Sequence, residues 1–377
     1  MVPRPRVLLL MPHLGGGGAE RVAQLLASHL SPDRYDIHLG LMASAQGSAA
    51  LDSIPSHVTV HSFPRQRVRN ALPDLLRVVW RVRPRVILSG MAHLNFLVLA
   101  ARPLLPRSTR IIVRQNGTIS AILQNASRPG TLRALYRALY RALYPRADRV
   151  ICQSDAMARD MQDIIQVSSS AIAVLPNPVD EAAIRCAVTG SLSRWPTSGS
   201  NILAISRLAH EKGIDILLHA VAQIKEDFPA SRLIILGKGP QEAALRELSA
   251  QLDLGDSVHF AGHVADPSAY FPGASLFVLP SRHEGIPNAL LEAAVASLPI
   301  VVTPASQGFV QLVGRSPGVW LAADSSPEAL ACALRDALRE LRSDEKYVHS
   351  WIPPFFLRNA IPAYQSILDE VLLWDSK

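Results

Sequence analysis

The sequence predicts an α/β protein of two domains, each built on a parallel β-sheet covered by helices. The chain has 377 residues, a length more typical of two domains than of one. Short apolar segments alternate with helix-like segments through both halves, which is the pattern of βαβ units. Between the halves, Pro176-Asn177-Pro178 and the Ser- and Gly-rich stretch 190–200 interrupt regular structure.

The expected strands are short runs of mostly apolar residues bounded by turn-forming ones. In the first half they cover residues 6–11, 35–42, 58–63, 85–89, 110–114 and 149–153, with helices over 19–30 and 71–82. In the second half they cover residues 201–205, 232–236, 258–261, 274–280 and 299–303. We therefore place an N-terminal domain at 1–180, a C-terminal domain at 181–350 and a final helical segment at 351–377.

Composition excludes several classes of protein. Apolar residues make up 49% of the chain, enough for two cores, yet no apolar run reaches the roughly 18 residues of a membrane span. The first strand is too short for a signal peptide and runs into Pro and Gly. Cys152, Cys186 and Cys332 are widely separated, which indicates a reducing compartment and offers no metal-ligand spacing.

Charge is divided unevenly along the chain. Residues 1–180 hold 22 Arg, no Lys and 10 acids, whereas the acids outnumber the basic residues in 181–377. A basic domain indicates an acidic partner, either nucleic acid or an anionic membrane surface. No recognised nucleic-acid-binding module is present, so we expect no nucleic acid.

A short repeat concentrates part of this charge. Arg-Ala-Leu-Tyr occurs three times in succession from Arg133, so arginines and leucines form separate stripes along one helix. The stripes comprise Arg133, Arg137 and Arg141; Leu135, Leu139 and Leu143; and Tyr136, Tyr140 and Tyr144. The helix is either a surface helix that packs its leucines on the sheet or a contact for anionic lipid headgroups, and both can hold.

The most informative motif joins two of the second-half strands. In His283-Glu284-Gly285-Ile286-Pro287-Asn288-Ala289-Leu290-Leu291-Glu292, two carboxylates lie eight positions apart. Gly and Pro place Glu284 in a loop and Glu292 two turns into the following helix. Such a loop opens at the carboxyl end of a parallel strand, where open α/β sheets bind ligands, and free N–H groups at the helix start favour an anion.

Three further segments carry residues suited to a diphosphate. Arg207 and Lys212 follow the first strand of the second half and supply two cations. Gly237 and Gly239 follow another strand and let the backbone approach a ligand closely. The run Gly15 to Gly18 precedes the first helix; it differs from a dinucleotide-binding loop because Glu20 stands where the third glycine belongs.

Together, these motifs resemble the retaining glycosyltransferases of family 4, also called glycosyl transferases group 1. The resemblance runs in order from residue 15 to residue 303 and includes "ADRVICQSDAMARDM" and "AVLPNPVD". It implies the GT-B fold, in which two Rossmann-like domains face across a cleft and the final helix returns to the N-terminal domain. It also implies that a nucleotide-diphosphate sugar binds the C-terminal domain and an acceptor binds the N-terminal domain.

The resemblance assigns a role to each site residue. Arg207 and Lys212 are expected to bind the donor diphosphate, and Glu284 the donor sugar, as the catalytic residues. Glu292 is expected to accept hydrogen bonds from the ribose. The remaining residues expected at the donor are Gly16, Gly17, Gly237, Gly239, His263, Gly285 and Ile286. No Asp-x-Asp motif lies nearby, so we expect neither metal nor cofactor besides the donor.

Two departures from the family pattern stand out. Many members carry a His at a strand end of the first domain, near the reacting sugar. The corresponding segment here is Val113-Arg-Gln-Asn-Gly-Thr-Ile-Ser120, so Gln115, Asn116 or the more distant His93 must fill that role. Ser297 also replaces a glycine that the family has before a strand.

The expected function is transfer of a hexose or N-acetylhexosamine, most often UDP-linked, to a polyprenyl-diphosphate-linked glycan or surface-polysaccharide precursor. Such a protein would lie in the cytoplasm, attached peripherally to the inner face of the membrane. The alternatives are a catalytically silent partner subunit and a transferase for a soluble acceptor. The sequence does not fix the sugar, the nucleotide, the linkage or the oligomeric state.

Overall fold

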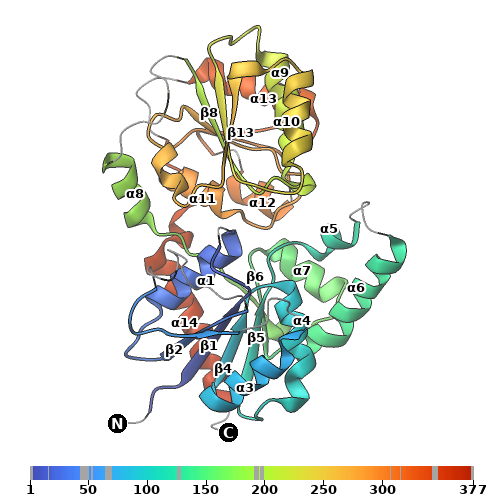
Figure 1. Ribbon diagram of the computed structural model, residues 1–377, viewed down its shortest axis with the longest axis vertical. Helices are drawn as coiled ribbons and strands as arrows, with labels where there is room; N and C mark the ends of the chain where they lie inside the picture. The colour runs from blue at the N-terminus through green and yellow to red at the C-terminus, as the bar shows by residue number, and fades with distance from the viewer. Residues whose placement is uncertain are drawn as a thin grey trace. The chain divides into compact units, whose positions relative to one another are not determined.

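The computed structural model divides the chain into two compact units (Figure 1). Unit 1 comprises residues 1–178 and 357–377, and unit 2 comprises residues 179–356. The residues that the structure describes are 3–15, 17–42, 51, 54–63, 70–124, 129–190, 195, 199–305, 307–314, 316–341 and 347–374.

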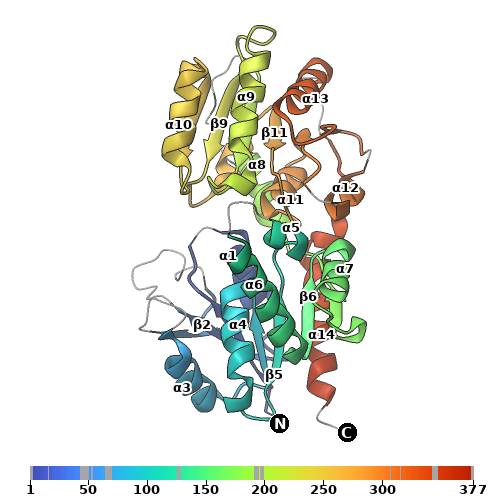
Figure 2. The ribbon, with the colours of Figure 1, turned by 90° about the vertical axis from the view of Figure 1, so that its right-hand side faces the viewer.

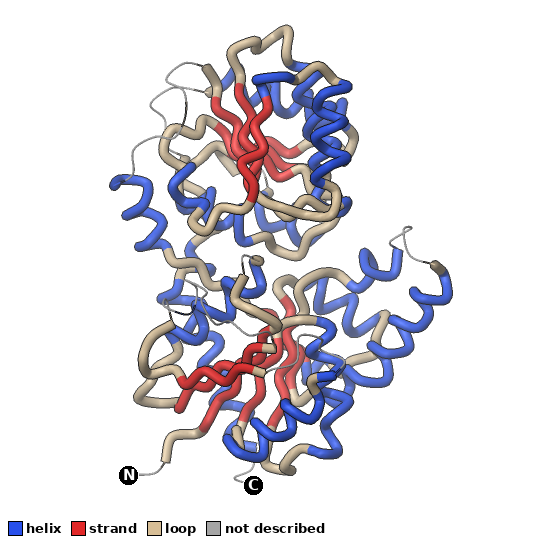
Figure 3. Tube along the Cα trace, viewed as in Figure 1, coloured by secondary structure: helices blue, strands red, loops and turns tan. Residues whose placement is uncertain are grey.

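Unit 1 is built on a seven-stranded parallel sheet of order β3-β2-β1-β4-β5-β6-β7. Strands are drawn in red in Figure 3. Its strands are β1 (Arg6–Met11), β2 (Asp36–Leu41), β3 (Thr59–Ser62), β4 (Val86–Ser89), β5 (Arg110–Arg114), β6 (Arg149–Cys152) and β7 (Ile172–Val174). The register places Leu9 of β1 beside Leu39 of β2 and Leu88 of β4. This is the strand order of a Rossmann-like domain.

Helices cover both faces of this sheet (Figure 2). They are α1 (Gly18–His29), α3 (Leu72–Val82), α4 (Ala92–Ala101), α5 (Ile119–Gln124), α6 (Gly130–Leu143), α7 (Asp155–Asp163) and α14 (Leu357–Leu373). Val7 and Leu9 belong to one core with α1 and α14, whereas Leu8 and Leu10 belong to the other with α3, α4 and α6. Alternate residues of a central strand thus serve opposite layers, as the pleat requires.

Unit 2 is built on a six-stranded parallel sheet of order β10-β9-β8-β11-β12-β13. Its strands are β8 (Asn201–Ile205), β9 (Arg232–Leu236), β10 (Val258–Gly262), β11 (Leu276–Leu279), β12 (Ile300–Val302) and β13 (Val319–Leu321). Its helices are α8 (Glu181–Gly190), α9 (Ile214–Ile224), α10 (Glu242–Gln251), α11 (Asn288–Val295), α12 (Gln307–Val313) and α13 (Pro327–Glu340). Side chains of α9 and α13 form one core, and those of α11 and α12 form the other.

Two edge strands, β7 and β13, are not predicted by the sequence. Each has only three residues, and each is partly exposed rather than buried. An edge strand of this length pairs on one side only and needs neither a continuous apolar run nor a clean alternation. The predicted strands correspond to observed ones, with ends that differ by at most two residues.

The last segment of the chain belongs to both units. The prediction groups residues 351–377 together, but Trp351, Phe355 and Phe356 are buried in the core of unit 2. Helix α14 begins directly after Phe356 and packs on unit 1, where the Tyr35 hydroxyl donates to Asp369 at 2.5 Å. Burial of the aromatic side chains therefore moves the start of the returning segment to Leu357.

Helix α6 departs from the expected stripes. Tyr140, Leu143 and Tyr144 are buried, whereas the Leu135 side chain is 53% exposed. Each four-residue step on a helix rotates about 40° beyond a full turn, so no single stripe follows the sheet along its whole length. Tyr140 and Tyr144 therefore share with Leu143 the core contact that the leucines alone were expected to make.

Candidate active site

The two central loops of unit 2 bring an ammonium and a carboxylate together. Lys212 closes a short 3₁₀ helix, η5 (His210–Lys212), after β8, and Glu284 lies in the loop after the neighbouring strand β11. Lys212 Nζ lies 2.5 Å from Glu284 Oε1, and Ser281 Oγ donates to the same oxygen at 2.9 Å. The Glu284 side chain is only 9% exposed. Sequence reasoning assigned these two residues to different parts of a donor but did not predict their direct contact, and it gave Ser281 no role.

Arg207 lies in the same loop as Lys212 but faces solvent. Its side chain is 65% exposed, and one guanidinium nitrogen lies 2.5 Å from Glu211 Oε1. Burial raises the pKa of Glu211, but hydrogen bonds from its own backbone and from Arg207 outweigh burial and leave the pKa below its ordinary value. The carboxylate therefore stays charged and holds the guanidinium near the loop.

Gly237 and Gly239 meet a packing requirement that the sequence analysis did not give. A Cβ added at Gly237 would lie 1.8 Å from the carbonyl oxygen of Ser206, and one added at Gly239 would lie 2.1 Å from that of Leu208. The two loops are also joined by the Leu208 N–H, which donates to the Lys238 carbonyl at 3.0 Å. The space that a side chain would need is thus filled by the protein's own backbone.

The other predicted donor residues differ in exposure. His263 is exposed just after β10, and Gly285 is buried in the loop that carries Glu284. Ile286 is buried in the hydrophobic core together with side chains of α11, so it anchors this loop to unit 2. Ile286 thus faces the core, Glu284 of the same loop is held by Lys212 and Ser281, and His263 faces solvent from another loop.

Glu292 lies on α11 as predicted, but nearer its start. Helix α11 begins at Asn288, so Glu292 is its fifth residue, just over one turn in rather than two. The side chain is half-buried. Pro287 precedes the helix and has no side-chain acceptor that could cap it. An uncapped helix start beside Glu284 suits a negatively charged group.

In unit 1, the glycine loop meets the side chain of Glu20. A Cβ added at Gly17 would lie 2.1 Å from Glu20 Oε2, so the carboxylate folds back over the first turn of α1. Its other oxygen lies 3.7 Å from His13 Nε2. Gly16, also predicted here, lies outside the described residues.

The three candidates for the missing histidine are not equally available. Gln115 is buried; its Nε2 donates to the Gly117 carbonyl, and its Oε1 accepts from the Tyr144 hydroxyl, both at 2.9 Å. Asn116 accepts from Arg114 and donates to the Gly90 carbonyl. The His93 side chain, in the first turn of α4, is exposed. Partial desolvation and then the charge of His13 lower the pKa of His93, which favours the neutral ring.

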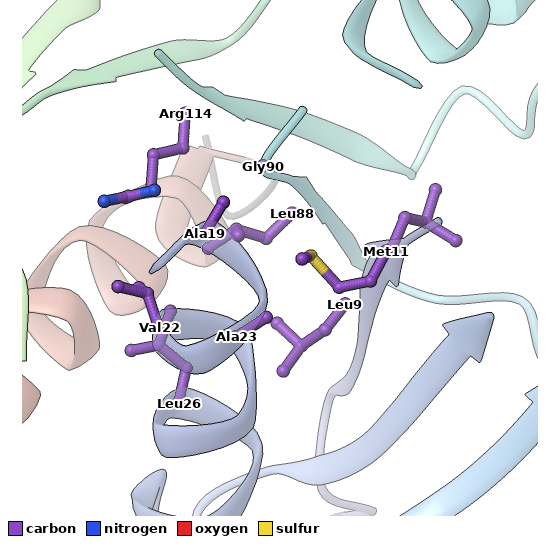
Figure 4. A pocket seen from close by; sticks show the side chains of 10 residues that line it. Leu9, Met11, Ala19, Val22, Ala23, Leu26, Leu88, Gly90 and Arg114 are labelled. Atoms are coloured by element: carbon purple, nitrogen blue, oxygen red, sulfur yellow. The ribbon is translucent and has the colours of Figure 1, made fainter. Parts of the chain in front are cut away.

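Arg114 is a buried cation that the sequence analysis did not single out. It is 2% exposed, and its guanidinium donates to the amide oxygens of Asn116 and Asn177. It also borders a small, otherwise apolar pocket between β1, β4 and α1 (Figure 4). The pocket volume is about 10 Å³, enough for roughly one water molecule and far too small for a sugar nucleotide.

Across the described ranges, no cluster of three or more His, Cys, Asp or Glu side chains is arranged to hold a metal ion. In the same part of the chain, no helix combines the length and the apolar character that crossing a bilayer requires.

Comparison with known proteins identifies the family. A family model described as glycosyl transferases group 1 matches residues 199–340, and one described as glycosyltransferase family 4 matches residues 16–183. The chain belongs to glycosyltransferase family 4. The predicted family is therefore confirmed, with the two matches covering the two units in the expected order.

Curated relatives of this family 4 member resemble it over part of their length. A putative colanic acid biosynthesis glycosyltransferase, WcaL from Escherichia coli, is 36% identical over 158 residues, which are 40% of this chain and 38% of that protein. An exopolysaccharide phosphotransferase from Streptomyces coelicolor is 28% identical over 230 residues, 61% of this chain and 23% of that protein. The chain thus spans well under half the length of these relatives.

Solved structures match over nearly the whole chain. HepE from Anabaena, solved in complex with UDP and glucose, superposes with a TM-score of 0.73 at 19% identity. The match covers 98% of this chain and 99% of that one. Together with the two parallel sheets, this likeness confirms the predicted GT-B fold.

Proposed function

We propose that this family 4 member transfers a sugar from a nucleoside-diphosphate donor with retention of anomeric configuration. The observation that carries the proposal is the contact between Lys212 and Glu284 at the carboxyl edge of the unit 2 sheet. Arg207 lies in the same loop as a second cation, and α11 begins beside Glu284. UDP in the complex of HepE, a structural relative, supports a UDP-linked donor.

In the proposed reaction, an acceptor oxygen bonds to the anomeric carbon as the bond from that carbon to the donor phosphate breaks. Arg207 and Lys212 stabilise the charge that develops on the leaving diphosphate. Glu284 accepts hydrogen bonds from sugar hydroxyls, and Glu292 accepts those of the ribose. The leaving phosphate takes the acceptor proton from the same face of the sugar, which gives retention without a covalent enzyme intermediate.

On the acceptor side, we assign the family's missing histidine role to His93. Gln115 and Asn116 already use their amide groups within unit 1, whereas the His93 ring is exposed. A neutral imidazole can both donate and accept, which suits a sugar hydroxyl. His93→Ala should therefore lower turnover while His93→Gln keeps part of it, and equal loss in both would reject the assignment.

The proposed acceptor is a polyprenyl-diphosphate-linked glycan or a precursor of a surface polysaccharide. The names of the relatives, which refer to colanic acid and exopolysaccharide, support it. Charge supports it too, because residues 75–147 contain 13 Arg and no Lys, Asp or Glu. A soluble small acceptor is the competing proposal, and a catalytically silent subunit is the third.

Assays with purified protein separate these possibilities. UDP-sugars would be tested with lipid-linked and soluble acceptors, with and without a chelator. Lys212→Ala or Arg207→Ala should lower turnover by on the order of 10² or more, because each removes a charge that stabilises the transition state. Glu292→Gln should weaken UDP binding, whereas Glu284→Gln should spare it and impair transfer. Turnover by both lysine and arginine variants within about threefold of wild type would reject the site.

The membrane proposal concerns one face of unit 1. Leu132 and Leu135 of α6 are exposed beside Arg133 and Arg137, whereas Arg141 is partly engaged because its Nε donates to the Ile164 carbonyl at 2.9 Å. Exposed leucines between arginines suit the headgroup region of an anionic bilayer, where each basic residue contributes about 1 kcal/mol.

Vesicle sedimentation tests this face. Wild-type protein should bind anionic but not neutral vesicles, and salt should weaken binding by screening. Arg133→Gln with Arg137→Gln should release the protein, whereas the equal charge change Arg246→Gln with Arg335→Gln in unit 2 should not. Equal release by both pairs would show that net charge, rather than this face, governs binding.

A further inference from the structure

The loop that carries Lys212 and the loop that carries Glu284 are tied together by one arginine. Arg282 Nη1 and Nη2 donate to the two carboxylate oxygens of Asp215, at 2.7 and 2.6 Å. Nη1 also donates to the His210 carbonyl at 2.8 Å, and the Arg282 backbone N–H donates to the Glu211 carbonyl at 2.9 Å. These bonds flank Lys212 on both sides along the chain.

Close packing of the two backbones completes the connection. Gly213 has a φ of 65°, in the left-handed region, and a Cβ added there would lie 1.9 Å from the Pro280 carbonyl oxygen. Residue 213 follows Lys212, and residue 280 precedes Ser281, which donates to Glu284. The loops therefore meet without intervening side chains, and Arg282 fixes their lateral register.

The Arg282–Asp215 pair has the geometry of a strong, directional contact. Two parallel N–H···O bonds between a guanidinium and a carboxylate restrict rotation as well as distance. The side chains of Arg282 and Asp215 are 24% and 33% exposed, so solvent screens the pair only in part. Burial raises the pKa of Asp215, but the hydrogen bond and charge of Arg282 outweigh it and hold the pKa below its ordinary value.

We propose that Arg282, oriented by Asp215, is the positioning residue that sets the distance between Lys212 and Glu284 for sugar transfer. Arg282 itself points to Asp215 and His210 and has no role in contacting the donor. The inference rests on the proposed function, because only there do Lys212 and Glu284 act on one substrate. A displacement of about 1 Å at reacting groups can lower the rate by roughly 100-fold.

A second arginine in the same unit, Arg335, also bonds to a carboxylate and a carbonyl and provides a matched control. Arg335 Nε donates to Asp227 Oδ2 at 2.7 Å, and its Nη2 donates to the Gln223 carbonyl at 2.6 Å. This pair joins α13 to the end of α9 and lies outside the Lys212 and Glu284 loops. Arg335→Gln therefore removes a similar arginine contact without touching either loop.

Steady-state kinetics and one chemical probe test the proposal. Arg282→Gln should lower turnover by about 10- to 100-fold, with the donor KM changed less than about threefold. Asp215→Asn should do the same, and the double variant should be no worse than either alone, because both remove one interaction. Arg282→Lys should recover part of the loss, and Arg335→Gln should stay near wild type.

The probe reads the Lys212 position without turnover. Acetylation by acetic anhydride, quantified by mass spectrometry, should modify Lys212 several-fold faster in Arg282→Gln than in wild type or Arg335→Gln, because the amine leaves Glu284. If Lys212→Ala is inactive while Arg282→Gln matches Arg335→Gln in both turnover and acetylation, the positioning role is wrong and the proposed function stands. If Lys212→Ala and Glu284→Gln keep full turnover, both proposals fail.

Discussion

The glycine loops of the two units differ in what occupies the space beside them. In unit 2, Gly213, Gly237 and Gly239 each lie against a backbone carbonyl of another loop, at 1.8 to 2.1 Å from the position that a Cβ would take. In unit 1, Gly17 lies against the end of the Glu20 side chain, and Gly15 against the His13 ring. A backbone carbonyl in a packed loop cannot move away from an added methyl group, whereas a carboxylate side chain can change rotamer.

This difference indicates that the unit 2 loops are built for a fixed geometry. Their relative positions are set by backbone packing and by the bonds of Arg282 to Asp215. In unit 1 the corresponding space holds a side chain that can move to make room for a ligand. Preorganised charge on the donor side and adjustable space on the acceptor side fit the proposed transfer.

The largest expected effect comes from Gly239→Ala. The added methyl would overlap three backbone atoms of Leu208, so one loop must shift. We expect unit 2 to lose on the order of 3 kcal/mol or more of its free energy of unfolding. Hydrogen exchange resolved by mass spectrometry would report each unit separately. Equal loss in both units, or no loss, would break the comparison.

The pH dependence of unit 2 gives a second test. His349 is buried, and its Nε2 lies 2.8 Å from the Leu298 carbonyl oxygen just after α11. Burial lowers its pKa, so the folded state resists a proton that the unfolded chain accepts below about pH 6.5. Stability is therefore unaffected above that pH and falls as pH drops below it.

His349→Gln should reduce the loss of unit 2 stability with falling pH, as measured by urea unfolding midpoints at pH 7.5, 6.5 and 5.5. The urea midpoint of unit 1 should still decrease with falling pH in this variant, because burial also lowers the pKa of His61 in unit 1. An unchanged slope in unit 2 would show that another group titrates on unfolding.

A stabilising change is expected next to the same turn. Ser297 ends the α11 segment with a φ of 61°, a conformation that costs a residue with a Cβ about 1 kcal/mol. Ser297→Gly should therefore raise the stability of unit 2 by roughly that amount, less the entropy that glycine adds to the unfolded chain. Calorimetry would measure the shift, and a destabilised variant would mean that the Ser297 side chain makes a contact that the backbone argument omits.

The smallest effect is expected for Gly17→Ala. Glu20 can rotate away from the new methyl, and what remains is the poorer fit of alanine than of glycine at the N-cap of α1, a difference below about 1 kcal/mol. We expect less than about 1 kcal/mol, with any larger change confined to acceptor KM. A loss of stability as large as that of Gly239→Ala would show that the unit 1 loop is packed as rigidly as the unit 2 loops.

Much of the fold could be predicted from the sequence because each local signal agreed with the next. Apolar strands, helices between them and the breaker-rich stretch at 176–200 indicated two parallel-sheet domains, and the order of motifs identified the family. The loop position of Glu284 and the helical position of Glu292 followed from Gly285 and Pro287 alone. These features depend on neighbours within a few residues, which a sequence displays directly.

Only the tertiary structure decided which residues meet. Lys212 and Glu284 are 72 positions apart, and Arg282 and Asp215 are 67 apart, so no local pattern reveals their contact. The same holds for Gly239, whose missing side chain is required by Leu208, and for Gln115, whose amide is already used by Tyr144. Chain folding brings the ends of neighbouring parallel strands to one edge of the sheet, and that juxtaposition turns separate motifs into a site.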